Sequence, residues 1–508
     1  MKNDHQQKSV KPMEYDNLQS TVLVLLVIGL YSYLYKYSKK EGSRFASNLP
    51  PGPPRWPILG NLPSLSLHSE RDMFEWNKKY GPVCHLKMAS TDFIILGTLE
   101  AVQEAFVKKC ETFSNRMQNV VPGLSGVDGI ACSNWSEKLK KQRKYCISTL
   151  KNFGMGRKSI EANILKECSI LCDKIKIYST AEKTFSIDFM LYEAFSGVIC
   201  HLAFGKNILQ ENKEFRKFIR SIAKSSSTLN SVMIFCPLLK VIPPFSWIRQ
   251  ETDGIENAVL KILNQEIESH KIARDPDKPR DFIDCFLNEM DKPNAHLDGF
   301  YHLQLVLSIR DIFYAGTETG SNTVAWLILY LCRYPEVQRK MQNEISEVLS
   351  EERQLSMSAS EDMHYTKAVI QETMRIRPVT PIGIPHVAAK EDTIMGYKIP
   401  KGAVVASNLF RIHNDETIWS DSECFRPERH LDQNGKFRKS PYVIPYSIGA
   451  RHCLGQQLGN TEIFLFVVSI FKTFSLTVKN IDSINMHGKN IVSLRPCNFE
   501  VTASERYR

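Results

Sequence analysis

An uncharged, mostly apolar run near the N-terminus stands apart from the rest of the chain. Residues 17–35 carry no charged side chain, and as an α-helix they reach about 28 Å, enough to cross the hydrocarbon core of a bilayer. A basic stretch follows over 36–44, whereas the charges before the run are balanced. The positive-inside rule therefore predicts one membrane span with its C-terminal side in the cytosol. A cleaved signal peptide is the alternative, but no small-x-small cleavage site follows the run.

A proline-rich segment leads from this run into the remainder of the chain. Five prolines over 49–57 fix φ and remove backbone donors, which makes a stiff connector. The expected organisation is a lumenal tail over 1–16, a transmembrane anchor over 17–35, a basic and proline-rich linker over 36–57 and one folded domain over 58–508.

Within the folded domain, hydrophobic periodicity predicts many helices and few strands. Helical patterns fill most of 101–377, and two apolar-rich runs over 303–331 and 453–474 are typical of core helices. Strands are expected over 83–88 and 93–96, in a hairpin of 394–399 and 403–407 turning at 400–402, and near 499–502. The predicted fold class is mainly α with a small β-rich lobe.

Composition narrows the class of protein. Hydrophobic residues are 43% and charged residues 24% of the chain, which argues against collagen-like, disordered and polytopic membrane proteins. The net charge of +10 suits an anionic membrane surface or an acidic partner, and no long Lys/Arg tract supports a nucleic-acid partner. Thirteen Cys residues without a C-x-x-C pair argue against disulfides and zinc, and favour a reducing compartment. No Walker A loop or complete G-x-G-x-x-G is present, so we expect no NADPH site.

Cys453 is the first candidate for chemistry. It lies at the start of the predicted helix 453–474, behind a loop that contains Gly449. Backbone N–H groups and the helix dipole at such a position favour a thiolate, which suits an axial metal ligand. Arg451 can offer its charge to a cofactor carboxylate. A lone buried Cys is more often an inert hydrophobe, so the surrounding spacing has to decide.

A polar interruption in the predicted helix 303–331 is the second candidate. Thr319 can bond back to the carbonyl of Ala315, and Gly316 leaves space beside it. The helical ladder can then open locally to admit water or a diatomic ligand. The alternative is the polar stripe of an amphipathic helix.

Glu372 and Arg375 form a third pattern. They stand three residues apart on a predicted helix that Pro378 stops, and could make a buried ion pair. Glu336 and Arg339 share the spacing and are expected to be an exposed pair, so the spacing alone indicates little.

Together these motifs resemble those of the cytochrome P-450 family. Residues 446–455 resemble its haem signature F-x-x-G-x-R-x-C-x-G with Tyr446 in the Phe place, and 315–319 resemble its oxygen-activation motif. Glu-x-x-Arg at 372–375 and the segment 425–429 follow the family's order. The segments at 152–156, 281–287 and 385–386 are similar to animal microsomal enzymes of family 2, which oxidise steroids, fatty acids and foreign lipophiles.

The resemblance implies haem b, with Cys453 as the axial ligand of its iron. It implies that Glu318 and Thr319 deliver protons. It also implies that the haem propionates are bound by Arg143, His386 and Arg451. Arg429 would complete a structural cluster with Glu372 and Arg375. Three departures are visible: Leu139 replaces a usual propionate-binding Trp, Gln456 replaces a frequent Glu, and His430 a usual Phe. Trp135, one turn before Leu139, is expected to pack rather than to bind. The changes at 430 and 456 are expected not to touch the chemistry.

The implied function is a membrane-anchored monooxygenase of the endoplasmic reticulum, with its catalytic domain in the cytosol. Electrons would come from NADPH-cytochrome P-450 reductase, with cytochrome b5 as a second candidate donor and a lipophilic small molecule as substrate. The basic residues of 138–144 would face the acidic reductase, or would simply be a solvated helix face. A haem-thiolate isomerase or dehydratase and a non-catalytic haem-binding protein are the alternatives; the intact Glu318-Thr319 pair argues against both.

Overall fold

The computed structural model describes most of the expected folded domain. The described residues are 28–29, 48–117, 129–152, 158–209, 212–216, 219, 235, 241, 243, 245–349, 353–490 and 493–506. Apart from positions 28 and 29, the expected anchor at 17–35 lies outside them, and so does most of 152–156. Among the described helices, none has both the length and the apolar character needed to cross a membrane.

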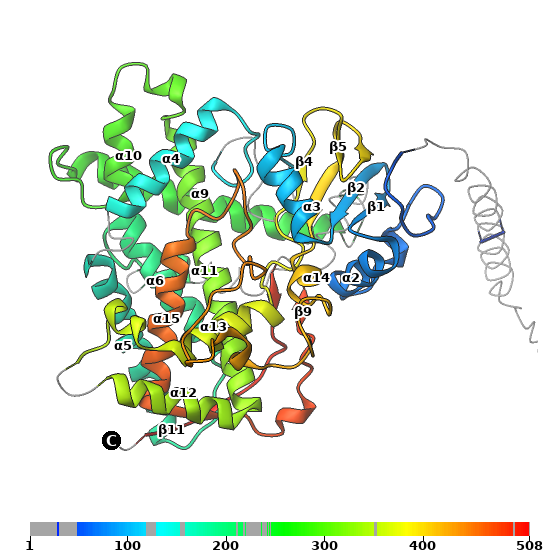
Figure 1. Ribbon diagram of the computed structural model, residues 1–508. Helices are drawn as coiled ribbons and strands as arrows, with labels where there is room; N and C mark the ends of the chain where they lie inside the picture. The colour runs from blue at the N-terminus through cyan, green and yellow to red at the C-terminus, as the bar shows by residue number, and fades with distance from the viewer. Residues whose placement is uncertain are drawn as a thin grey trace, which may run out of the picture.

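A large helical body and a smaller β-rich lobe make up the domain, as the fold-class prediction has it (Figure 1). The α-helices are α2 Ser69–Tyr80, α3 Leu99–Gln103, α4 Glu137–Asn152, α5 Lys158–Thr180, α6 Asp188–Phe204, α9 Phe245–Ala273, α10 Phe282–Met290, α11 His302–Arg333, α12 Pro335–Val348, α13 His364–Ile376, α14 Leu409–His413 and α15 Gln456–Thr473. The short turns are η1 Leu62–Ser64, η2 Glu104–Lys108, η4 Ala295–Asp298, η5 Met357–Glu361, η6 Pro427–His430 and η7 Ile481–Ser483.

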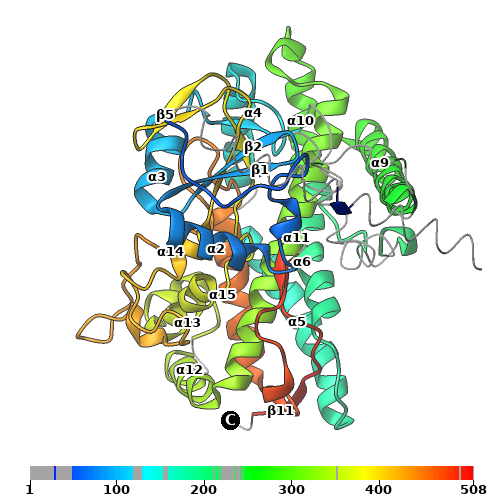
Figure 2. The same cartoon turned by 90° about the vertical axis from the view of Figure 1, so that its right-hand side faces the viewer.

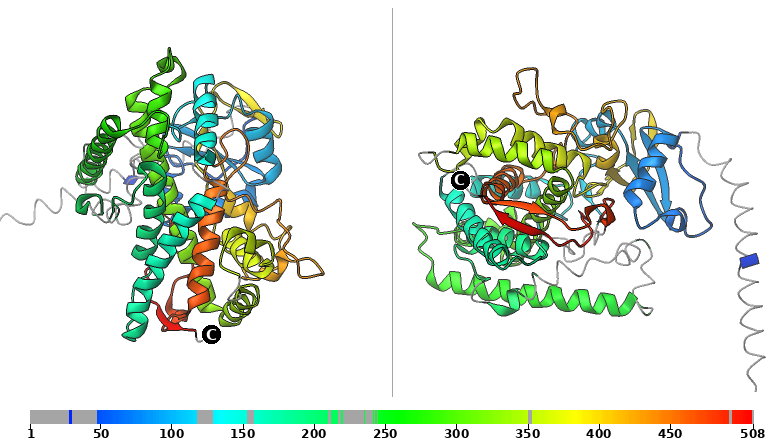
Figure 3. Two further views of the ribbon diagram at one scale, coloured as in Figure 1. Left: turned by 90° about the vertical axis from the view of Figure 1, so that its left-hand side faces the viewer. Right: turned by 90° about the horizontal axis from the view of Figure 1, so that it is seen from below.

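Helix α11 forms the centre of the body, as the apolar run 303–331 predicts. Every residue from Val324 to Leu331 is buried, because a helix that is apolar all round must be covered on all sides. Helices α6, α15, α9 and α13 pack against it. Figure 2 shows α11, α6 and α5 side by side, and Figure 3 shows α9 along one edge of the body.

Helix α15 starts later than predicted. The expected helix began at Cys453, but the structure begins it at Gln456. The reason is local, since the N–H of Cys453 donates to the carbonyl of Tyr446 at 3.0 Å and closes a loop instead of a helical turn. Cys453 therefore precedes the helix, and Gly455 is its N-cap.

One mixed sheet organises the β-rich lobe, with strand order β1-β2-β7-β4-β3. Its strands are β1 Val83–Met88, β2 Thr91–Leu96, β3 Asn115–Arg116, β4 His386–Val387 and β7 Val404–Ser407. The strands expected at 83–88 and 93–96 are β1 and β2, paired antiparallel. Strand β7 runs parallel to β2 on its other side.

The hairpin predicted from 394–399 and 403–407 is wrong. Strands β5 (Asp392–Ile394) and β6 (Tyr397–Ile399) pair with each other, and β7 joins the main sheet. Met395 and Gly396 make the turn with φ of 48° and 82°, the pair of positive values that a two-residue hairpin requires. The predicted strand near 499–502 is β11 Thr502–Glu505, which pairs with β8 Phe474–Thr477; β9 Lys489–Asn490 and β10 Leu494–Arg495 form a further pair.

Candidate active site

The loop ahead of α15 approaches the β-rich lobe closely at Gly449. Gly449 has φ of +84°, and a Cβ there would lie 2.0 Å from the carbonyl oxygen of Phe106. Phe106 belongs to η2, a π-type turn in which Lys109 N–H bonds five residues back to Glu104 at 2.9 Å. Only glycine fits at 449, because any side chain would push the loop away from η2.

Cys453 is accessible although protein surrounds it. Burial raises the pKa of its thiol, while the N–H of Gly455 and the charge of Arg143 lower it. The side chain is nevertheless exposed. A thiol that burial desolvates and that is still exposed can contact a ligand, so the sulfur is available as a ligand atom.

Three guanidinium groups gather beside this loop. Arg143 donates to the carbonyl of His452 at 2.6 Å, and Arg451 donates to the carbonyls of Ala131 and Ser133 at 2.7 and 2.8 Å. Arg116 donates to Ile384 O at 2.7 Å. All three are buried, and within the described residues none makes an ion pair with a carboxylate.

Their electrostatics fit an anionic ligand. Burial and mutual repulsion lower the pKa of Arg116 to about 9 and of Arg451 to about 8. The Nε atoms of both are buried without a hydrogen-bond partner among the described residues. Buried charges are normally paired, so this site fits a group that carries carboxylates, as haem b does with its two propionates.

His386 borders the same cluster. Its Nδ1 lies 2.5 Å from the carbonyl of Phe113, and its ring stacks on Phe106 with centroids 3.8 Å apart. Burial and the neighbouring arginines hold its pKa well below the ordinary value. The structure thus brings together the sequence-predicted residues Arg143, His386 and Arg451.

Arg116 is the functional candidate that the sequence analysis missed. It lies on β3, directly opposite His386 on β4. The two residues are 270 positions apart, so no local spacing in the sequence predicts that they pair. The register of β3 against β4 brings them together.

On α11, the polar interruption has the predicted local geometry. Thr319 Oγ1 donates to Ala315 O at 2.7 Å, which confirms the expected back-bond. Ala315 is exposed although it lies in the middle of a core helix. Ile384, beside Arg116, is 40% exposed. Both side chains are apolar and accessible, which suits contact with an apolar ligand.

Glu318 accepts a hydrogen bond from Ser493 Oγ at 2.6 Å on Oε1. Burial raises the pKa of its carboxyl, and the bond from Ser493 and the charge of Arg495 act in the opposite direction. A raised pKa keeps a carboxyl protonated at higher pH than usual, which suits a proton donor.

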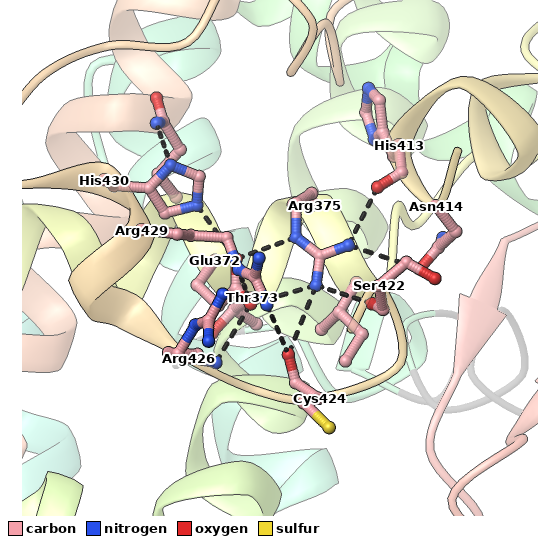
Figure 4. A network of polar contacts seen from close by, with 12 residues as sticks. Glu372, Thr373, Arg375, His413, Asn414, Ser422, Cys424, Arg426, Arg429 and His430 are labelled. Carbon is pink, nitrogen blue, oxygen red and sulfur yellow. Dashed lines mark hydrogen bonds and ion pairs between the residues drawn. The ribbon is translucent and has the colours of Figure 1, made fainter. Parts of the chain in front are cut away.

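Glu372 and Arg375 form a buried bidentate ion pair on α13, with N–O distances of 2.8 and 2.9 Å (Figure 4). Arg429 adds a bond of 3.0 Å to Glu372, as expected for the structural cluster. His430 also binds Glu372, at 2.9 Å. His430, which replaces the family's usual Phe, is therefore part of this structural cluster. As expected, it does not take part in the proposed chemistry.

Leu139 and Trp135 lie where the sequence departs from the family's propionate-binding Trp. Leu139 is buried at 3% exposure and carries no donor. Within the described residues the indole Nε1 of Trp135 is buried without a hydrogen-bond partner, and the Lys140 ammonium lies 5.3 Å from its ring centroid. The Trp135 ring contacts Lys140, and that Trp135 packs rather than binds a propionate stays a prediction.

One other group of metal-ligand side chains, His270, Asp281 and Asp284, occurs among the described residues. Asp281 caps α10 and binds His270 at 2.9 Å, while Arg280 holds Asp284 at 2.6 and 3.0 Å. With these partners in place, the group links α9 to the start of α10 through a His270–Asp281 hydrogen bond.

The domain is mainly helical, with an accessible cysteine ahead of a core helix and a guanidinium cluster that suits an anion. These features are typical of a haem-thiolate oxidoreductase. The family model "Cytochrome P450" matches residues 50–503, and the chain belongs to that family. It is 32% identical to cytochrome P450 2J3 of Rattus norvegicus over 95% of this chain and 96% of the relative. Cytochrome P450 2J2 of Homo sapiens is 32% identical (94% and 95% covered), as is 2C8 of Homo sapiens (93% and 97%). Enzymes of this family bind haem b, and the chain is a monooxygenase of this class.

Proposed function

We propose that Cys453 is the axial ligand of haem iron and that Arg116, Arg143, Arg451 and His386 hold the propionates. The observation that carries this is a buried guanidinium cluster that pairs with no carboxylate in the part of the chain that the structure describes, next to an accessible sulfur. When bound, haem supplies the redox-active iron at which O₂ is reduced.

The roles of the chain's own residues follow from their bonds. Gly455 N–H and Arg143 stabilise the thiolate of Cys453. Glu318 carries the proton on its carboxyl, and the Thr319 hydroxyl can exchange its bond to Ala315 for one toward the reacting oxygen. Together they supply protons to the reacting oxygen while the surrounding apolar side chains exclude bulk water.

The substrate in this proposal is a lipophilic small molecule such as a steroid, a fatty acid or a xenobiotic. Ala315 and Ile384, accessible and apolar, support it because they offer contact area without a charge to bind. Specificity would then depend on shape more than on hydrogen bonds.

NADPH-cytochrome P-450 reductase is the proposed electron donor, with cytochrome b5 as a second. A hollow of about 240 Å³ on the side of the cysteine loop supports this, lined by Trp135, Lys140, Arg143, Lys144, Ile147, Ala450 and His452. Its basic rim matches an acidic partner. The anchor proposed at 17–35 would hold the domain on the cytosolic face of the endoplasmic reticulum, with the linker 36–57 between them.

The test combines a spectrum with a turnover ratio. Reduced protein with carbon monoxide should show the red-shifted band of thiolate ligation, and Cys453→Ala should lose it while Cys424→Ala, an exposed cysteine outside the loop, keeps it. Thr319→Ala should retain haem but yield more peroxide and less product per NADPH. A band that survives in Cys453→Ala contradicts the ligand assignment, and wild-type turnover without NADPH would favour an isomerase.

A further inference from the structure

Glu318 is held on one side by residues from the far end of the chain. Ser493, just before β10, donates its hydroxyl to Glu318 Oε1 at 2.6 Å. Asn322, one helical turn after Glu318, donates through Nδ2 to the same Ser493 oxygen at 2.9 Å. Trp326, a further turn along α11, donates Nε1–H to the carbonyl of Leu494 at 3.0 Å. The segment at 493–494 is therefore fixed along one face of α11 at three successive turns.

The direction of these bonds determines where hydrogens lie on Glu318. An amide NH₂ only donates, so Ser493 Oγ accepts from Asn322 and has its single hydrogen left for Glu318. With Ser493 donating to it, Oε1 of Glu318 accepts a hydrogen bond in this arrangement. Oε2, which Ser493 does not contact, is the carboxyl oxygen left to carry the proton of the neutral acid.

Opposing influences act on this carboxyl. Burial raises the pKa of Glu318, whereas the bond from Ser493 and the charge of Arg495 lower it. Tyr192 and Tyr314 face it as well, since the charge of Glu318 raises the pKa of both phenols. Ser493 thus stabilises the ionised form of Glu318, which burial disfavours. A proton donor needs a stable ionised form if it is to release a proton and take it up again.

We propose that Ser493 and Asn322 are positioning residues that direct the proton of Glu318 to Oε2, an inference that rests on the proposed role of Glu318 in proton delivery. Only an O–H bond is involved: it breaks at Oε2 when the proton leaves for the oxygen being protonated. It forms again with a proton from solvent. Ser493 keeps its own hydrogen throughout and holds the carboxylate in the interval.

The experiment compares Ser493→Ala with Ser493→Thr, which restores a hydroxyl. Ser196→Ala is the matched control, because Ser196 also makes a buried hydroxyl bond to α11, to Thr317 Oγ1 at 3.2 Å. One readout is the infrared titration of the Glu318 carboxyl in the holoenzyme, isolated by subtracting the spectrum of Glu318→Gln. The other is product formed per NADPH oxidised, with reconstituted reductase and a lipophilic substrate that gives a spectral shift.

Ser493→Ala should move the infrared midpoint to higher pH, because the carboxylate loses a donor. Product per NADPH should fall by about tenfold, the usual effect of losing one hydrogen bond to a charged group. Ser493→Thr should recover both, and Ser196→Ala should match wild type. An unmoved midpoint in Ser493→Ala, or an equal shift in Ser196→Ala, overturns the inference. Wild-type coupling in Glu318→Gln would instead overturn the proposed function, and the infrared midpoint separates the two failures.

Discussion

His430 donates its Nε2–H to Glu372 Oε2 at 2.9 Å, and its other ring nitrogen accepts from the amide of Gln371 at 2.8 Å. Because an amide NH₂ cannot accept, Nδ1 must be unprotonated and the ring neutral. Burial lowers the pKa of His430 in the same direction. Glu372 thus receives a neutral donor in addition to Arg375 and Arg429. Burial alone would raise the pKa of Glu372, but the hydrogen bonds from Arg375 and His430 outweigh burial and lower it to about 2.

Replacing this donor should cost stability without affecting the haem spectrum. His430→Phe leaves one N–H of Gln371 and one lone pair of Glu372 unsatisfied in a buried site, although Gln371 keeps its bond to Arg438 O. We expect a loss of about 1–3 kcal/mol in the free energy of unfolding, measured by denaturant titration of the holoenzyme. His487→Phe, at an exposed position, is the control. Equal stability of His430→Phe and wild type would show that the network does not need the histidine.

Acid should destabilise the protein through His413. Its Nε2 accepts from Ile444 N–H at 2.8 Å, and burial lowers its pKa to about 3. The unfolded chain takes up a proton near pH 6.5 and the folded chain does not, so stability is complete above that pH and declines below it. Between pH 6.5 and 5 the loss is about 2 kcal/mol.

His413→Gln tests this directly, because its amide oxygen can still accept from Ile444 but cannot titrate. The pH dependence of the denaturation midpoint should be shallower in the variant over this interval. An identical slope in the two proteins would assign the acid sensitivity to other groups.

Local spacing explains what could be foreseen from the sequence. The back-bond from Thr319 to Ala315 and the ion pair of Glu372 with Arg375 involve residues three or four positions apart on one helix, where geometry follows from the helical repeat. Strand β1 likewise follows its short alternating run. Such features need no knowledge of the rest of the fold.

Contacts between distant segments could not be foreseen in this way. Arg116 meets His386 only because β3 pairs with β4, and Ser493 reaches Glu318 only because the segment before β10 lies along α11. The wrong hairpin has the same origin, since β7 pairs with β2 and β4 and not with β6. Pairing across the chain depends on packing that hydrophobic periodicity does not encode.

Arg116 should contribute to haem retention. Arg116→Leu removes one of three buried guanidinium groups and should speed haem loss by about tenfold or more, the effect of one charge-assisted bond. Haem transfer to an acceptor globin measures it. Arg116→Lys should recover part of the retention because the charge remains. Arg353→Leu, which removes an exposed arginine paired with Asp362, should leave the rate unchanged; wild-type retention in Arg116→Leu would exclude Arg116 from the site.

Lys144 should matter more than Lys140 for electron transfer. Lys140 is already paired with Glu111 and Glu137 at 3.0 and 2.7 Å, whereas Lys144 is exposed at the hollow beside His452. If an acidic reductase docks there, Lys144→Glu places like charges across the interface and slows association. Reductase-supported turnover should fall severalfold at low ionic strength and recover as salt screens the repulsion.

The control for Lys144→Glu lies on the same helix. Lys151→Glu makes the same change of charge in the last turn of α4, at an exposed position that does not line the hollow. If docking depends on the hollow, Lys151→Glu keeps nearly the wild-type rate and salt dependence. If both variants slow turnover equally, the reductase responds to the net charge of the protein, and the basic residues of α4 are a solvated face.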